Sequence, residues 1–156
     1  MKIWGVDPGV SGALALVDTD GMSVSLHEMP TLTVKKKREV SPFLLSDIFA
    51  SEPNAPVILE AVHAMPGQGV TSMFNFGKSY GCILGVVAGM SMRIQTVTPS
   101  KWKKDMSVPA GKDGARARAM ELFPSASEYF ARKKDDGKAE ASIIAMWGLK
   151  FGAEEL

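Results

Sequence analysis

Three short strand-like segments, joined by tight turns, occupy the first 30 residues and constrain the fold more than any other feature. Residues 2–7 and 13–17 are apolar, and the proline, glycine and serine residues between 8 and 12 favour a turn. After a second turn at 18–21, residues 22–29 alternate between apolar and polar side chains, which is the period of a half-buried strand. Strands joined by such short turns pair antiparallel. The chain is therefore predicted to begin with a three-stranded meander.

The remaining segments alternate between helical and extended patterns, which predicts an α/β fold. Helices are expected at 40–51, 71–89, 99–104, 113–122 and 136–151, and strands at 57–62 and 93–97. This order is typical of a mixed five-stranded sheet flanked by helices. A chain of 156 residues without repeats is expected to form one domain, residues 1–156. Residues 31–39 and 106–112 are expected to be the least ordered.

The long helix predicted at 71–89 carries a glycine at every fourth position. These glycines share one helix face and are Gly77, Gly81, Gly85 and Gly89. Each costs a helix about 1 kcal/mol relative to alanine, so four in register indicate a close backbone approach. The partner in that approach is the sheet, a neighbouring helix or a second subunit.

Composition limits the classes of protein to which the chain can belong. With 46% hydrophobic and 22% charged residues, it is predicted to be globular and soluble. A single cysteine, Cys82, excludes an intrachain disulfide and a zinc site built mainly on cysteine. No apolar run reaches the length of about 18 residues that a membrane span needs, and the acidic Asp7 interrupts any signal peptide. A cytoplasmic protein is expected.

Basic residues are concentrated in three places, although the net charge is only +1. One cluster is 35–38, a second lies between 100 and 118, and a third is 132–134. Each cluster alone is better explained by a solvated face or loop. Together they indicate a footprint for phosphate groups, as in proteins that bind nucleic acid.

Two predicted strands end in a carboxylate, which is unusual for otherwise apolar segments. Asp7 follows residues 3–6, and Glu60 follows residues 57–59. A charge there is costly unless it is paired or bound to a metal, although acidic residues also close ordinary strands. If the two strands are neighbours, the carboxylates raise each other's pKa unless a cation lies between them.

The last predicted helix supplies further carboxylates. Asp136 and Glu140 are four residues apart and share a face, while apolar residues of the same helix can cover the core. The alternative is that Asp136 or Asp135 only caps the helix and that Glu140 is solvated. Carboxylates without a histidine or cysteine cluster suit Mg²⁺ or Mn²⁺. Two such ions about 3.5–4 Å apart can activate water and stabilise the leaving oxygen in phosphodiester hydrolysis.

Taken in order, these segments resemble the RuvC family of Holliday-junction resolvases, particularly its short phage and bacterial versions, within the ribonuclease-H-like superfamily. The matching segments are 3–9 with Gly12, 57–60, the glycine-bearing helix after 67–69, 99–104, Lys112 with 122–124, and 136–141. The resemblance implies a homodimer that binds branched DNA, namely four-way junctions, and nicks two strands symmetrically with Mg²⁺, for which Mn²⁺ can substitute. It also implies a bacterial cytoplasmic setting, of cellular or phage origin, with no membrane and no small-molecule cofactor.

The resemblance also implies roles for individual residues. Asp7, Glu60 and Glu140 match the metal-ligand positions. The fourth ligand is assigned to Asp136, with Asp135 in reserve, because Gly137 occupies the position three before Glu140.

The resemblance extends to residues that contact DNA. Lys112 is counted with the catalytic residues, because it and Lys103 match basic residues that contact the scissile region. The predicted DNA-binding set is Lys101, Lys103, Lys104, Lys112, Met73 and Phe74. An aromatic ring at Phe74 would stack on an unpaired base for about 1–3 kcal/mol, unless it is ordinary core.

Three other functions deserve comparison. The turn from Asp7 to Gly12 also resembles the phosphate-binding turn of sugar kinases and actin-like ATPases, but those proteins need a second lobe for which this chain has no room. A ribonuclease-H-like nuclease that acts on RNA–DNA hybrids or RNA is an open alternative. A DNA-binding protein that recognises branches without cutting is another, and its signature would be loss of Asp7 or Glu60, both of which are present.

Overall fold

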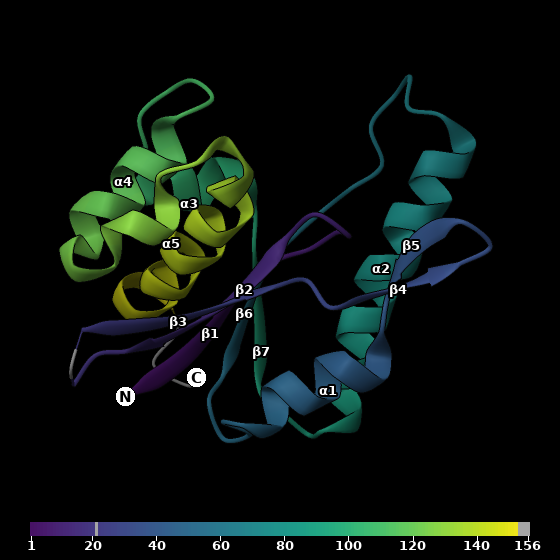
Figure 1. Ribbon diagram of the computed structural model, residues 1–156, viewed down its shortest axis with the longest axis horizontal. Coiled ribbons are helices and arrows are strands. Elements are labelled where there is room, and N and C mark those ends of the chain that lie inside the picture. Colours follow the sequence, from purple (N-terminus) through teal and green to yellow (C-terminus); the bar gives the residue numbers. More distant parts are fainter. Residues whose placement is uncertain (21, 153–156) are drawn as a thin grey trace.

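A five-stranded sheet organises the computed structural model, which describes residues 1–20 and 22–152. Its strands are β1 (Lys2–Asp7), β2 (Ala13–Asp18), β3 (Ser23–Glu28), β6 (Val57–Glu60) and β7 (Ile94–Val97). Their order across the sheet is β3-β2-β1-β6-β7 (Figure 1). β1, β2 and β3 pair antiparallel, whereas β6 runs parallel to both β1 and β7. The predicted meander and the mixed sheet are confirmed.

Helices cover both faces of this sheet (Figure 1). They are α1 (Pro42–Ala50), α2 (Val70–Gly89), α3 (Pro99–Asp105), α4 (Gly114–Leu122) and α5 (Asp136–Phe151), with the 3₁₀ helices η1 (Pro124–Phe130) and η2 (Lys133–Asp135). Each predicted helix and strand appears, with ends within two residues of those expected. None of the helices in the described ranges is both long and apolar enough to cross a membrane.

The alternation of side chains along β1 divides the core into two layers. Ile3 packs with buried residues of α3, α4 and α5, whereas its neighbour Trp4 packs with those of α1 and α2. β6 does the same with Ile58 and Leu59. Because successive strand residues point to opposite faces, one short strand serves both layers.

Helix α5 lies in direct contact with the middle of the sheet because small residues face each other there. A Cβ at Gly5 of β1 would overlap the backbone carbonyl of Ala141, and one at Gly148 would overlap Ile58. Such overlap excludes any larger side chain unless the helix moves away. The first half of α5 is thereby held against the end of β1, where Asp7 lies.

The segment expected to be poorly ordered, 31–39, is instead most of a β-hairpin, so that prediction is wrong. β4 (Thr31–Val34) pairs antiparallel with β5 (Lys37–Val40). The two residues between them, Lys35 and Lys36, have φ angles of 48° and 66°. A two-residue type I′ turn requires positive φ at both positions, which asparagine and glycine usually supply. Residues 106–112 form neither helix nor strand.

The glycine face of α2 does not contact the rest of the described chain. At Gly77, Gly81, Gly85 and Gly89, an added Cβ would meet nothing within 4 Å among residues 1–20 and 22–152. The opposite face, which includes Ile83 and Val87, packs into the core. The expectations of a close approach to the sheet or to another helix are therefore wrong, and contact with a second subunit stays a prediction.

Candidate metal centre

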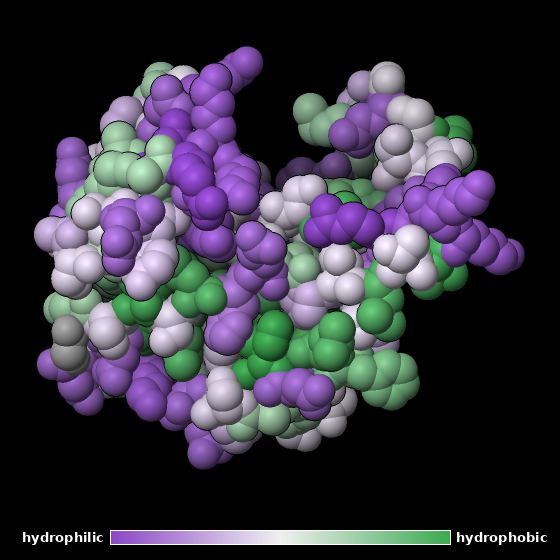
Figure 2. All heavy atoms as spheres, viewed as in Figure 1, coloured by the Kyte–Doolittle hydropathy of each residue, from purple (hydrophilic) through white to green (hydrophobic). Residues whose placement is uncertain are grey.

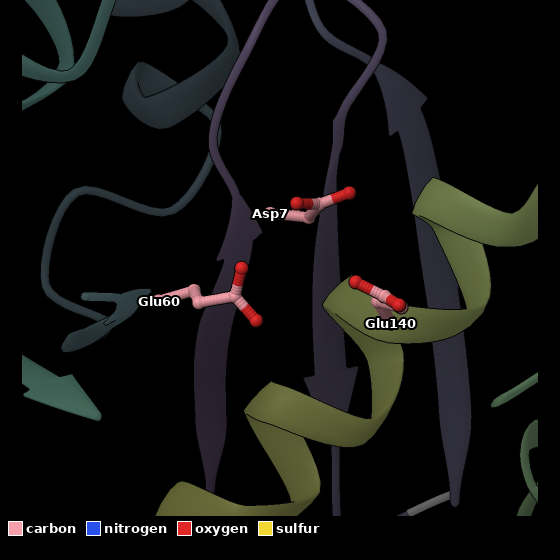
Figure 3. A group of neighbouring side chains, drawn as sticks. All are labelled: Asp7, Glu60 and Glu140. Carbon is pink, nitrogen blue, oxygen red and sulfur yellow. The ribbon is translucent and has the colours of Figure 1, made fainter. Parts of the chain in front are cut away.

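Three carboxylates from separate elements meet at one end of the sheet (Figure 3). The parallel register pairs Val6 of β1 with Leu59 of β6, so the next residues along, Asp7 and Glu60, lie side by side at the ends of their strands. Helix α5 brings Glu140 over the same point. One oxygen from each of the three carboxylates lies within 4.8 Å of the others. The structure thus brings together the three predicted ligands.

Burial and mutual repulsion act on these carboxylates. Burial raises the pKa of Asp7 well above its ordinary value, and the charge of Glu140 is the next largest cause. The charges of Glu60 and Asp136 raise the pKa of Asp7 further, while Lys103 lowers it. Burial also raises the pKa of Glu140, to about 6, and that of Glu60. A divalent cation between these groups would favour their charged forms.

Helix α3 contributes two contacts that the sequence did not reveal. The indole Nε1 of Trp102 donates a hydrogen bond of 2.7 Å to Oε2 of Glu60. The ammonium group of Lys103 lies 3.6 Å from Oε1 of Glu140. The sequence predicts Lys103 as a DNA contact only and indicates no role for Trp102. A tryptophan among the lysines of a short helix is the one sequence signal that pointed to a buried partner.

Asp136 and Asp135, which lie next to each other in the sequence, differ in their surroundings. Asp135 is 1% exposed, and both of its oxygens accept hydrogen bonds from the Arg132 side chain. These bonds lower the pKa of Asp135. Asp136 lies outside the group of three, but its Oδ1 is buried and has no hydrogen-bond partner among residues 1–20 and 22–152. Of the two, Asp136 is the one with a free ligand atom.

Gly137, three residues before Glu140, lies where the start of α5 approaches the turn after β1 closely. A Cβ there would lie 3.2 Å from Oδ2 of Asp7 and 3.1 Å from the carbonyl oxygen of Ser11. Both contacts are tighter than ordinary van der Waals contact. A larger residue here would therefore require the turn after β1 or the Asp7 side chain to shift by a few tenths of an ångström.

The other predicted lysines differ in their surroundings. Lys112 lines a cavity of about 400 Å³ together with Lys133 and Asp136, so it is at the edge of the site. Lys101 pairs with Asp105 at 3.0 Å. The remaining predicted lysine, Lys104, is exposed.

The remaining predicted DNA contacts are at the start of α2. Phe74 is 70% exposed, which excludes the alternative that it belongs to the core. Met73 is partly buried and lines a small cavity with His63 and Tyr80. Figure 2 shows a notch between the lobe formed by α3, α4 and α5 and the lobe that carries α2 and the hairpin, with hydrophilic side chains over the hairpin and along the first lobe.

The donor atoms of the site fit Mg²⁺ or Mn²⁺ better than softer metals. All three clustered ligands are carboxylates, and hard divalent cations prefer oxygen. The buried, unpartnered Oδ1 of Asp136 adds a fourth oxygen nearby. The two histidines of the chain, His27 and His63, are not among the clustered residues.

Comparison with known proteins places this geometry in context. No protein-family profile matches the chain. A segment of 93 residues, 58% of the chain, is 32% identical to the chloroplastic Holliday junction resolvase MOC1 of Chlamydomonas reinhardtii. That segment corresponds to 10% of the length of MOC1.

Two solved structures resemble the whole chain. Thermus thermophilus RuvC in complex with a Holliday junction substrate has a TM-score of 0.67 and 13% sequence identity, with 98% of each chain covered. A further structure of T. thermophilus RuvC has a TM-score of 0.66 and 14% identity, with 96% of each chain covered. The predicted ribonuclease-H-like fold, in its RuvC form, is confirmed.

Proposed function

We propose that this chain is a metal-dependent endonuclease that cuts four-way DNA junctions. One observation carries the proposal: the carboxylates of Asp7, Glu60 and Glu140 converge at the end of the sheet of a RuvC fold. A buried group of three like charges is unfavourable by itself, and a bound cation is the simplest compensation. The similarity of 93 residues to a Holliday junction resolvase supports the choice of substrate.

The four carboxylates are proposed to have different roles as metal ligands. If two cations bind, Asp7 is the candidate for the ligand that both share, because Glu60 and Glu140 lie on either side of it (Figure 3). Asp136 is the candidate fourth ligand. Bound Mg²⁺, for which Mn²⁺ would substitute, supplies Lewis acidity that activates a water and stabilises the leaving oxygen of a phosphodiester. The rest of the chain binds and orients the DNA.

Lysines around the carboxylates would hold the phosphate backbone. Lys103 lies against Glu140, and Lys112 lines the cavity that also includes Asp136. Lys101 and Lys104 extend the same basic surface along α3. Phosphate contacts of this kind supply most of the affinity of nucleic-acid binding and make it sensitive to salt. The exposed ring of Phe74 would stack on an unpaired base at the branch point, beside Met73.

Paired, symmetric nicks require two active sites, so we propose a homodimer. The open glycine face of α2 is a candidate for the contact between subunits, because close approach of backbones is possible there. The proposed setting is the bacterial cytoplasm, with a gene of cellular or phage origin. Neither a membrane nor a small-molecule cofactor enters the proposal.

The choice of substrate separates this proposal from its alternatives. The assay compares a synthetic four-way junction, a linear duplex and an RNA–DNA hybrid of the same sequence, each with Mg²⁺ and with EDTA. We expect Mg²⁺-dependent nicks at symmetric positions of the junction only. Equal cutting of the hybrid would contradict the resolvase proposal and support a ribonuclease-H-like nuclease. Tight binding of the junction without cutting would support a protein that recognises branched DNA but does not cleave it. Light scattering of the free protein tests the dimer.

A further inference from the structure

Trp102 places a buried hydrogen-bond donor on one of the three clustered carboxylates. Its indole is fully buried, and Nε1 lies 2.7 Å from Oε2 of Glu60, which is itself 8% exposed. Hydrogen bonds to a charged acceptor are shorter and about twice as strong as neutral ones. A buried indole N–H without a partner would also be costly. Both groups therefore depend on this bond.

We propose that Trp102 is a positioning residue for the metal centre, fixing the carboxylate of Glu60 so that its other oxygen faces the cation. Glu60 is the last residue of a four-residue strand, and a glutamate side chain has three rotatable bonds. With Oε2 held by the indole, rotation about the last bond is restricted. Partners that orient metal ligands in this way contribute about 10–100-fold to metal affinity.

Lys103, the residue after Trp102, gives helix α3 a second contact with the carboxylate cluster. Lys103 lies 3.6 Å from Glu140 and, at the same time, 5.2 Å from the centroid of the Trp102 ring. Two successive residues of one short helix thus contact two of the three clustered carboxylates. Helix α3 is itself fixed at its start, where the side chain of Thr98 accepts a hydrogen bond from the Lys101 backbone. Helix α3 therefore contacts both the Glu60 and the Glu140 side of the carboxylate cluster.

A second tryptophan provides a matched control. Trp147 is also buried, and its Nε1 donates a hydrogen bond of 2.8 Å to Oδ2 of Asp105. The two bonds share the donor, the type of acceptor and the degree of burial of the indole. They differ in the acceptor: Asp105 is not among the clustered carboxylates, is more exposed than Glu60 and also pairs with Lys101. A purely structural role for Trp102 predicts that neither change lowers the affinity of the folded protein for metal.

The first test is metal binding by the free protein, measured by calorimetric titration with Mn²⁺ for the wild type, Trp102→Phe and Trp147→Phe. Phenylalanine keeps an aromatic ring and removes the N–H. Unfolding in urea with EDTA reports how much stability each variant loses, and we expect Trp102→Phe alone to bind Mn²⁺ about tenfold or more weakly. Affinity within about twofold of wild type for Trp102→Phe, or an equal loss in Trp147→Phe, would overturn the proposal.

The second test uses the wild-type protein and does not depend on a variant that folds. In a nitrogen–proton NMR correlation spectrum, each tryptophan gives one indole signal. Added Mg²⁺ should shift the signal of Trp102 more than those of Trp147 and Trp4, because only Trp102 bonds to a ligand. An unmoved Trp102 signal in a protein that the titration shows to bind the cation would contradict the proposal.

Cleavage separates this inference from the proposed function on which it partly rests. Trp102→Phe should require a higher Mg²⁺ concentration for half-maximal junction cleavage, and excess Mg²⁺ should restore most of the rate. A rate that stays low at saturating Mg²⁺ would argue against positioning through Glu60. If the wild type binds metal but cuts no junction, the proposed function fails while the role of Trp102 in metal binding stands.

Discussion

Replacing Glu140 by glutamine tests the electrostatics of the metal centre without using DNA. Burial raises the pKa of Glu140 from 4.5 to about 6, despite the nearby charge of Lys103. Each pKa unit corresponds to about 1.4 kcal/mol, so the charged carboxylate costs the metal-free fold about 2 kcal/mol. The side chain is 18% exposed, so screening by solvent reduces this figure little. Glu140→Gln should remove most of that cost.

The sign of the pH dependence follows from the raised pKa. Because the folded state holds the proton more tightly than the unfolded state, the cost is absent below about pH 4.5 and complete above about pH 6. In EDTA, Glu140→Gln should therefore be more stable than wild type by about 2 kcal/mol near pH 8, and by about 0.8 kcal/mol near pH 5. This corresponds to a rise in Tm of about 4–8 °C near pH 8.

Urea unfolding in EDTA at the two pH values measures the effect, with Glu128→Gln as the control because Glu128 is exposed on η1. The control should change the free energy of unfolding by less than about 0.5 kcal/mol at both pH values. Adding Mg²⁺ should stabilise the wild type but not Glu140→Gln, since only a bound ligand shifts the unfolding equilibrium. The reasoning is refuted if Glu140→Gln is no more stable than wild type near pH 8, or gains equally at both pH values.

Three further substitutions test other parts of the molecule. Lys103→Ala should weaken junction binding and lower the slope of log affinity against log salt by about 0.9, measured by fluorescence anisotropy; Lys2→Ala, at the opposite end of β1, should leave that slope unchanged. Gly5→Ala should destabilise the fold by about 1–3 kcal/mol in urea and weaken Mn²⁺ binding, because the added methyl group meets the Ala141 carbonyl. Unchanged stability would show that α5 can move away from β1 at little cost. Gly85→Leu should leave folding intact and lower the dimer fraction in light scattering, and an unaffected dimer would assign the subunit contact to another face.

The sequence predicted the elements that form the carboxylate group because each follows from a local pattern and one topological step. Asp7 and Glu60 each end an apolar segment, and a parallel pairing of their strands brings the two together. Once the small residues of α5 face β1, the helical period of α5 places Glu140 near Asp7 and Glu60. These rules require no knowledge of side-chain conformation, which is why they were sufficient.

Other features depend on contacts that a local pattern does not encode. The hydrogen bond from Trp102 to Glu60 joins residues 42 positions apart, and its existence depends on where α3 packs. The difference between Asp135 and Asp136 depends on the conformation of the Arg132 side chain. The hairpin is not evident from the sequence because lysines at positions 35–36 occupy turn positions where glycine or asparagine would be the usual signal.

The glycine face of α2 shows a different limit. A repeat of small residues predicts that something approaches closely, but the pattern is the same for a sheet, a helix or another subunit. The described chain excludes the first two because the space beside these glycines is open.

The most direct test of the central claim is cleavage of a synthetic four-way junction by the wild type and by Asp7→Asn, with junction binding measured on the same samples. Asparagine keeps the shape of the side chain and removes the charge that the metal requires. We predict Mg²⁺-dependent nicking by the wild type, none by Asp7→Asn, and junction binding by both, because lysines rather than Asp7 hold the phosphates. Cleavage by Asp7→Asn at the wild-type rate, or cleavage by the wild type in EDTA, would contradict a carboxylate-bound metal as the catalytic centre.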